Sequence, residues 1–346
     1  MPPPVRYDPP PAWPMAARRF QPMLRRLLPL FVLVSCGPPP TPKAAAPAAV
    51  SGGAPVAAAP ASARPVPPAL PAPTQKALRV HIIGASVSGG FEDGPLTRAK
   101  EQGDSLPLQK LLEQWAGDDA RVSTHNLDRM LAMFTDPLKI GREQMQGASR
   151  ARPDVLVAID FPFWFAYGHM AGDVAAARQQ RLAAGLAMLD KLEMPILLGD
   201  LPDMHGAATR MLSARQIPEP ELLQRLNEQL AEFVKAHPNM RLVPLARMVR
   251  TMKDEGASLP LATGALKTPP GALLQEDRLH ATRLGIAFLG YALQEDLRAA
   301  FPAGHPLREQ VWTFEQFVEA AGAEGELEQV AATARGAKAK AAGAGK

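Results

Sequence analysis

Residues 78–90 read LRVHIIGASVSGG, and this stretch decides the fold class of the chain. The apolar run Leu78–Ile83 predicts a buried strand, and the small residues after it predict a tight turn into a helix. Ser86 lies on that turn. Because α/β sheets bind ligands beyond the carboxyl ends of their strands, the Ser86 hydroxyl is expected at a ligand-binding edge.

Strand-like and helix-like segments alternate from this stretch to about residue 300. Further strands are predicted at residues 121–126, 154–160, 195–199 and 241–245. Helices are predicted at residues 105–115, 138–148, 173–192, 218–235 and 280–300. This alternation predicts an α/β three-layer sandwich, in which a five-stranded parallel sheet of the flavodoxin-like type is covered by helices on both faces.

The composition divides the 346 residues into four parts. Residues 1–35 are expected to be an N-terminal extension and signal peptide, and residues 36–77 a tether rich in proline and alanine. Residues 78–303 form the expected folded domain, and residues 304–346 a C-terminal helix with a disordered basic tail. The tether has too little apolar bulk to offset its ordering entropy, and at ~3 Å per residue it reaches on the order of 100 Å.

The lone cysteine, Cys36, directly follows the short apolar run Leu27–Ser35, which two arginines precede. This order is typical of a secretory signal, since the run is too short to span a bilayer. Its Leu-Val-Ser-Cys ending resembles the bacterial lipobox, in which the cysteine is lipidated. We therefore expect a lipid-anchored protein of the bacterial cell envelope, and Gly37 favours the outer membrane, facing periplasm or surface. An ordinary signal peptide with an incidental cysteine is the alternative.

A second polar segment, residues 277–280 (DRLH), lies near the end of the folded part. It places a carboxylate and an imidazole three residues apart, so that Asp277 could orient the ring of His280. With Ser86, these residues supply the hydroxyl, base and acid that nucleophilic acyl transfer needs. A purely structural serine is the alternative.

Both segments resemble the signature blocks of the SGNH/GDSL hydrolase superfamily. Residues 84–90 (GASVSGG) resemble its Gly-Asp-Ser block, with Ala85 in place of aspartate. Residues 277–285 (DRLHATRLG) resemble its Asp-x-x-His block, with Ala281 where proline often follows the histidine. The order of elements also fits this family throughout residues 78–300.

The resemblance implies a serine esterase or acyl hydrolase that uses no cofactor. It implies Ser86 as the nucleophile, His280 as the base and Asp277 as the acid that orients the base. The substrate would be an acyl ester or an acylated glycan or lipid of the envelope. Hydrolysis and acyl transfer to another acceptor both stay open at this point.

The oxyanion donors of this family are only partly present in the chain. Members supply the nucleophile's own amide, a glycine amide after the second strand and an asparagine side chain after the third. This chain has HNLDRM at 125–130 and DFPFW at 160–164. The expected donors are therefore the Ser86 amide, the region of Gly89 and the Asn126 carboxamide, although Asn126 could instead cap a turn. Since losing one donor costs ~10²–10³ in rate, a non-catalytic binding protein in envelope or polysaccharide assembly is the main alternative.

Aromatic and acidic side chains follow the third and fourth predicted strands. The aromatic ones are Phe161, Phe163, Trp164, Phe165 and Tyr167. They predict either a wall for an acyl chain or sugar ring, or a plug that closes the core. Asp160 and Asp200 each end an apolar strand, where a buried carboxylate needs a partner. Each could serve the structure, by capping a helix or forming an ion pair, or could contact the substrate. The candidate substrate-binding residues are Asp160, Phe161, Phe163, Trp164 and Asp200.

Charge and residue spacing argue against nucleic-acid binding, metal binding and dinucleotide binding. The net charge of +4 comes partly from the signal and the tail, and no basic stripe is interleaved with aromatic residues, so no nucleic acid is expected as a partner. The histidines lack metal-ligand spacing, so no metal is expected, and a lone cysteine excludes an intrachain disulfide. The turn at residues 84–90 loosely resembles a dinucleotide-binding loop, but its spacing is not Gly-x-Gly-x-x-Gly. The oligomeric state is not predicted.

Overall fold

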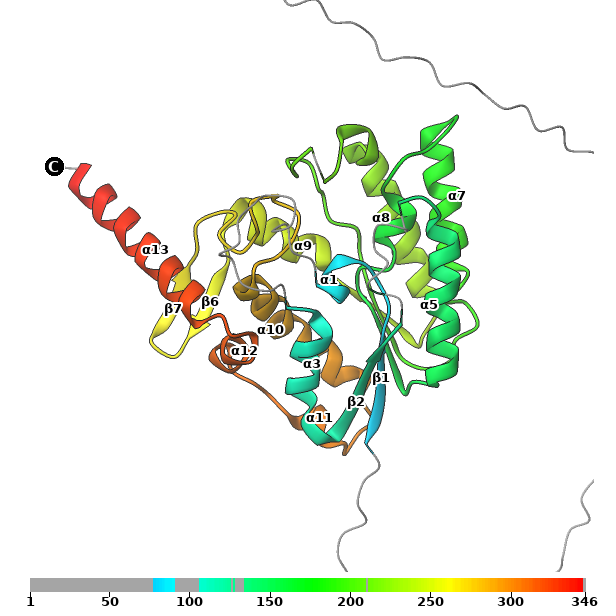
Figure 1. The fold of residues 1–346 in the computed structure, drawn as a ribbon, viewed down its shortest axis with the longest axis horizontal. Coiled ribbons are helices and arrows are strands. Elements are labelled where there is room, and N and C mark those ends of the chain that lie inside the picture. The colour runs from blue at the N-terminus through cyan, green and yellow to red at the C-terminus, as the bar shows by residue number, and fades with distance from the viewer. Residues whose placement is uncertain (1–76, 91–105, 126, 128–133, 210, 345–346) are drawn as a thin grey trace, which may run out of the picture. The chain divides into compact units, whose positions relative to one another are not determined.

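The computed structural model describes residues 77–90, 106–125, 127, 134–209 and 211–344. Within these residues, five strands form one sheet: β1 (Leu78–Ile82), β2 (Ala120–Thr124), β3 (Val155–Ala158), β4 (Ile196–Gly199) and β5 (Met240–Val243). The strand order is β2-β1-β3-β4-β5, and every neighbouring pair is parallel (Figure 1). The predicted five-stranded parallel α/β sheet is confirmed.

Helices cover both faces of the sheet, as Figure 1 shows. One face is covered by α3 (Leu108–Ala116) and α10 (Arg283–Ala300). The other is covered by α5 (Pro137–Ala151), α7 (Val174–Leu186) and α8 (Pro220–Lys235). Every residue of β3 and β4 is buried, because a parallel sheet covered on both sides hides both faces of its central strands.

The helix predicted after the first strand is the short α1 (Ser86–Gly89). Several other short elements were not predicted. They are η1 (Gly117–Asp119), α6 (Phe163–Ala166), η3 (Ala214–Gln216), α9 (Leu245–Arg250), the π-helix η4 (Thr251–Glu255), the hairpin of β6 (Ser258–Leu261) and β7 (Gly264–Lys267), and α11 (Pro306–Glu309). Each is too short to establish a hydrophobic period in the sequence. Three of these elements, α9, η4 and the hairpin, fill the connection between β5 and α10, beside the carboxyl edge of the sheet.

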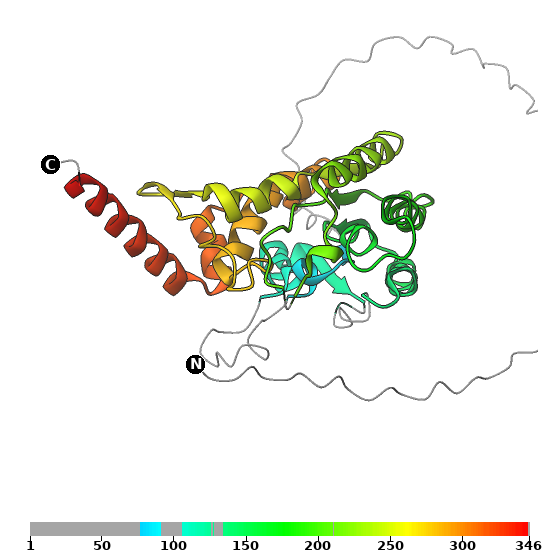
Figure 2. The same ribbon diagram turned by 90° about the horizontal axis from the view of Figure 1, so that it is seen from above.

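The compact part extends past residue 303, the expected end of the domain. Helix α12 (Phe314–Ala321) buries Phe314 and Phe317 and packs against α10 and α3. Helix α13 (Glu324–Ala344) then leads away from the sheet (Figure 2). It includes most of residues 336–346, which were expected to be a disordered tail. The alanines of that segment favour a helix, because alanine has the highest helix propensity of all residues.

The N-terminal predictions lie outside the described residues, which begin at residue 77. The signal peptide, Cys36 and nearly all of the tether therefore stay predictions. Of the helices in the described part, none combines the length and the hydrophobicity that crossing a membrane requires.

Candidate active site

Ser86 is the first residue of α1, directly beyond the end of β1. Gly84 makes the turn between them with a φ of 152°, in the region that favours glycine. A Cβ at this position would lie 1.9 Å from Oδ1 of Asp160 and 2.6 Å from Oγ of Ser88. Only glycine fits there, because both the backbone conformation and the crowding by Asp160 exclude a side chain.

Asp160, which follows β3, caps the turn that carries Ser86. Its Oδ2 accepts the N–H groups of Val87 (2.8 Å) and Ser88 (3.1 Å), and its Oδ1 accepts the Ser88 hydroxyl at 2.5 Å. Burial raises the pKa of Asp160, while the hydrogen bonds from Ser88 and from the amides of the turn act in the opposite direction. A carboxylate here satisfies the free amides at the start of α1 and faces the positive end of the helix. Of the two roles considered for Asp160, its hydrogen bonds therefore support helix capping.

Gln144 of α5 holds the same turn from the other side, and sequence analysis missed it. Its Nε2 donates to the Gly84 carbonyl at 2.9 Å, and its Oε1 accepts the Gly84 N–H at 3.2 Å. Its side chain is completely buried. A glutamine on the buried face of an amphipathic helix is the one signal that could have revealed this clamp, since buried amides need partners. Asp160 and Gln144 together fix the backbone before and after Ser86.

Asp277 and His280 form a buried pair on the segment before α10. His280 Nδ1 lies 2.5 Å from Asp277 Oδ2, while Asp277 Oδ1 accepts the N–H groups of Leu279 (2.9 Å) and His280 (3.0 Å). Arg278 takes a φ of 56°, which bends the chain so tightly that the carboxylate reaches back to the ring. Burial alone would raise the pKa of Asp277, but its contacts with His280 outweigh burial and lower it. An ionised Asp277 then orients the ring, with Nε2 as the nitrogen that would take up a proton.

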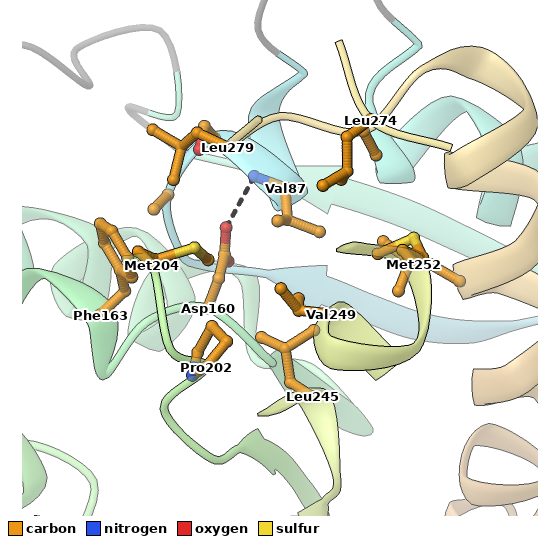
Figure 3. A pocket seen from close by; sticks show the side chains of 14 residues that line it. Val87, Asp160, Phe163, Pro202, Met204, Leu245, Val249, Met252, Leu274 and Leu279 are labelled. Carbon is orange, nitrogen blue, oxygen red and sulfur yellow. Dashed lines mark hydrogen bonds between the residues drawn. The ribbon is translucent and has the colours of Figure 1, made fainter. Parts of the chain in front are cut away.

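One pocket joins the serine turn to the loop of the buried pair (Figure 3). Its lining includes Ser86 and Asp160, and also Leu279 and Ala281, the two chain neighbours of His280. Twelve of its fourteen lining residues are apolar. A hydrogen bond between Ser86 and His280 stays a prediction. Two segments far apart in the sequence thus line one cavity, although His280 and Asp277 themselves are not among its lining residues.

The aromatic residues after β3 divide between the two roles considered for them. Phe163 lines the pocket. Phe161 and Trp164 are buried and are not among the lining residues; their rings pack edge-on against Phe165 and Phe134, with centroids 5.0 and 4.8 Å apart. Phe161 and Trp164 therefore act as the plug, and Phe163 alone contributes to the wall.

Two further candidate residues do not line the pocket and have backbone partners of their own. Asp200 Oδ1 accepts the N–H of Ala246 at 2.6 Å, so this carboxylate caps α9, and it does not line the pocket. The Gly89 N–H donates to the Ala85 carbonyl at 2.9 Å. This bond within α1 uses the Gly89 amide and corrects its expected role as an oxyanion donor. Asn126 lies outside the described residues.

The Ser86 amide lies in the first turn of α1, where the N–H groups of a helix have no acceptor within the helix. The next two amides already donate to Asp160. Among the described side chains, no three histidine, cysteine, aspartate or glutamate residues gather as metal ligands.

Comparison with known proteins gives structural matches only. No family model matches the sequence, and no curated protein is significantly similar to it. A gut microbial diltiazem-metabolizing enzyme matches at 12% identity and a TM-score of 0.40, covering 64% of this chain and 47% of that one. A GDSL-like lipase from Bacteroides thetaiotaomicron matches at 14% identity and 0.37, covering 67% and 94%. The SGNH-hydrolase family esterase AlinE4 matches at 18% identity and 0.26, covering 66% and 100%.

Two of these structural neighbours are named as a GDSL-like lipase and an SGNH-hydrolase family esterase, and the sequence resembles the same superfamily. This chain spans about half the length of the first neighbour. At such identities and TM-scores the matches carry no argument about activity. The fold assignment rests instead on the strand order and on the helices that cover both faces of the sheet.

Proposed function

We propose that this protein is a carboxylic-ester hydrolase with Ser86 as its nucleophile, His280 as its base and Asp277 as the acid that orients the base. The pocket carries the proposal, because Ser86 and both chain neighbours of His280 line it. The buried contact of 2.5 Å between His280 and Asp277 supports it further, since a base must be oriented to accept a proton.

In the proposed reaction, Ser86 Oγ attacks the ester carbonyl carbon while its proton passes to His280 Nε2. Asp277 stays ionised and stabilises the imidazolium. The Ser86 amide, at the positive end of α1, donates to the oxyanion. His280 returns the proton to the departing alcohol, and a water molecule then hydrolyses the acyl-enzyme by the same steps in reverse. We propose the Asn126 carboxamide as a second donor, which would replace the amides committed to Asp160.

We further propose that the pocket takes the acyl chain of the ester rather than a sugar ring. Met204, Leu245, Val249, Met252 and Leu274 belong to its wall, and Ser86 and Asp160 are its polar lining residues. Sugar hydroxyls buried against such a wall would lose their hydrogen bonds to water without replacement, whereas an alkyl chain gains from leaving water. An acylated envelope glycan or lipid would then present only its acyl group to this site.

A non-catalytic acyl-binding protein is the second candidate, and the position of Asp160 favours it. A carboxylate on the pocket wall disfavours a second negative charge nearby, and an oxyanion would carry that charge. A protein that only holds an acyl chain would not meet this cost. In either function, we propose that a lipid on Cys36 anchors the chain to the bacterial outer membrane.

Labelling with a fluorophosphonate separates the two candidates, because only an activated serine reacts with it. We expect the wild type to be labelled and to hydrolyse p-nitrophenyl esters, and Ser86→Ala to do neither. Ser149→Ala, which removes an exposed serine on α5, is the matched control and should leave both signals unchanged. A wild type that neither reacts with the probe nor hydrolyses esters would exclude the hydrolase and favour the binding protein.

A further inference from the structure

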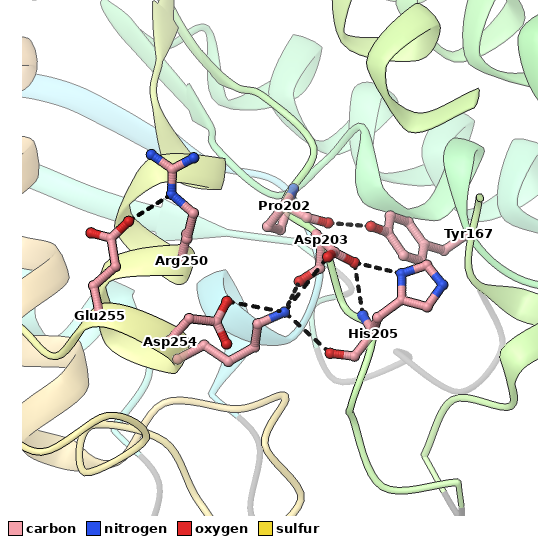
Figure 4. Close-up of polar contacts among 8 residues, drawn as sticks. Tyr167, Pro202, Asp203, His205, Arg250, Asp254 and Glu255 are labelled. Carbon is pink, nitrogen blue, oxygen red and sulfur yellow. Dashed lines mark hydrogen bonds and ion pairs between the residues drawn. The ribbon is translucent and has the colours of Figure 1, made fainter. Parts of the chain in front are cut away.

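Lys253 is a buried cation that lies behind the pocket wall and does not line the pocket. Only 5% of its side chain is exposed. Its Nζ donates to the carbonyls of Asp203 (2.8 Å) and His205 (3.1 Å), and it lies 3.8 Å from Asp203 Oδ2 and 3.6 Å from Asp254 Oδ2. Figure 4 shows this group of contacts around Asp203 and His205. Two carbonyls and two carboxylates offset the cost of burying the ammonium.

The two carbonyls belong to residues 201–208, here called the Met204 segment, which carries Pro202 and Met204 into the pocket wall. The ends of this segment are fixed independently of Lys253. The Asn227 side chain pairs with the N–H and carbonyl of Leu201 at 2.7 and 2.9 Å. At the other end, the Ala208 N–H donates to the Asp277 carbonyl at 2.8 Å. Lys253 therefore controls the middle of the segment, where the wall residues lie.

Contacts inside the Met204 segment add to this anchoring. Asp203 Oδ1 accepts both the N–H (2.8 Å) and the Nδ1 (2.7 Å) of His205. Burial alone would raise the pKa of Asp203, but hydrogen bonds from His205 and the charge of Lys253 lower it, so the carboxylate faces the ammonium in its ionised form. The Tyr167 hydroxyl donates to the Pro202 carbonyl, and its ring stacks on Phe163 with centroids 4.2 Å apart. The Met204 segment is thereby tied to the aromatic side of the pocket as well.

Lys253 and its pocket-lining neighbour Met252 are the two buried residues of the π-helix η4. Met252 lines the pocket, Lys253 contacts the backbone of the Met204 segment, and Asp254 and Glu255 are exposed. Arg250 closes this turn by pairing with Glu255 at 2.9 Å (Figure 4).

We propose that Lys253 is a positioning residue that sets which acyl chains the pocket accepts, by holding Met204 and Pro202 in the wall. This inference rests on the proposed acyl specificity of the site. Lys253 does not touch the substrate, because it acts through the backbone of the Met204 segment. Its loss would leave both ends of the segment attached and free only the wall between them.

The test measures binding in the Ser86→Ala background, so that it does not depend on hydrolysis. The probe is cis-parinaric acid, a fluorescent long-chain fatty acid, displaced by fatty acids of increasing chain length. Lys253→Met keeps most of the side-chain volume but removes the charge and the hydrogen bonds. We expect the ratio of long-chain to short-chain affinity to change about tenfold in Lys253→Met. Lys235→Met, at an exposed lysine of α8 that pairs with Glu232 one turn earlier, is the matched control and should leave the ratio unchanged.

A double-mutant cycle with Met204→Ala shows whether Lys253 acts through Met204. If it does, the double variant should change the affinity ratio no more than either single variant, since both remove the same wall. Additive changes, an unchanged ratio in folded Lys253→Met, or an equal weakening of all chain lengths would each overturn the proposal. Lys253→Gln, which keeps one amide donor, completes the cycle if Lys253→Met does not fold. An intact cycle without fluorophosphonate labelling of the wild type would contradict only the hydrolase function.

Discussion

Replacing Asp160 tests whether one carboxylate holds the serine turn in place. In Asp160→Ala, the N–H groups of Val87 and Ser88 and the buried Ser88 hydroxyl lose their acceptor. A buried group left without a partner costs ~1–3 kcal/mol, and water entering from the pocket relieves part of this, so we expect a loss of about 3 kcal/mol in unfolding free energy. In Asp160→Asn, the amide oxygen can accept both N–H groups while its nitrogen donates to Ser88 Oγ. That variant should lose about 1 kcal/mol, because only the charge is removed.

Urea unfolding followed by circular dichroism measures both values, and the slope against urea should not change. Asp173→Ala, which removes an exposed cap of α7 formed by the same residue type, is the control and should cost about 1 kcal/mol. Fluorophosphonate labelling of Ser86 should slow strongly in Asp160→Ala and much less in Asp160→Asn, because the turn keeps its geometry. A loss below that of Asp173→Ala would refute the reasoning. Equal losses in both Asp160 variants would show that the charge, not the hydrogen bonds, stabilises the turn.

Three other predictions concern separate parts of the chain. Burial and the charge of His125 lower the pKa of His81 to about 4, so the unfolded state gains a proton before the folded state does as the pH falls below 6.5. Stability should therefore fall by about 3 kcal/mol between pH 6.5 and 4 in urea titrations, and His81→Leu should flatten this dependence. Cys36→Ala should move the protein from the membrane fraction to the soluble fraction, and continued anchoring would contradict lipidation. Asn126→Ala should lower kcat by ~10²-fold with little change in KM if its carboxamide meets the oxyanion, and an unchanged kcat would remove Asn126 from the site.

The sheet was predictable because its central strands are continuous apolar runs. Strands β3 and β4 are buried on both faces, so each reads as an unbroken hydrophobic segment, and an aspartate follows shortly after each. The Asp277–His280 pair was predictable from spacing alone, since the two groups lie three positions apart on one loop. Short elements such as α9 and η4 were not, because neither is long enough to display a period.

The polar partners of the site could not be predicted in the same way. Asp160 and Asp200 both end apolar strands, yet one caps the serine turn and lines the pocket, while the other caps α9 away from it. Which backbone amides lie opposite a carboxylate depends on how distant segments pack. Gln144 and Lys253 are buried polar residues whose partners come from loops far away in the sequence. Their importance follows only from those contacts.

The commitment of Asp160 to the serine turn has a consequence for catalysis. The amides of Val87 and Ser88 serve the stability of the turn and are not available to an oxyanion. A site with one donor fewer loses ~10²–10³ in rate. Burial of each methylene contributes ~0.8 kcal/mol, or about fourfold in kcat/KM, so about four additional buried methylenes would offset most of that loss. Such an enzyme would depend on the length of the acyl chain more than on the strength of its oxyanion hole, which is consistent with a pocket whose wall is mostly apolar.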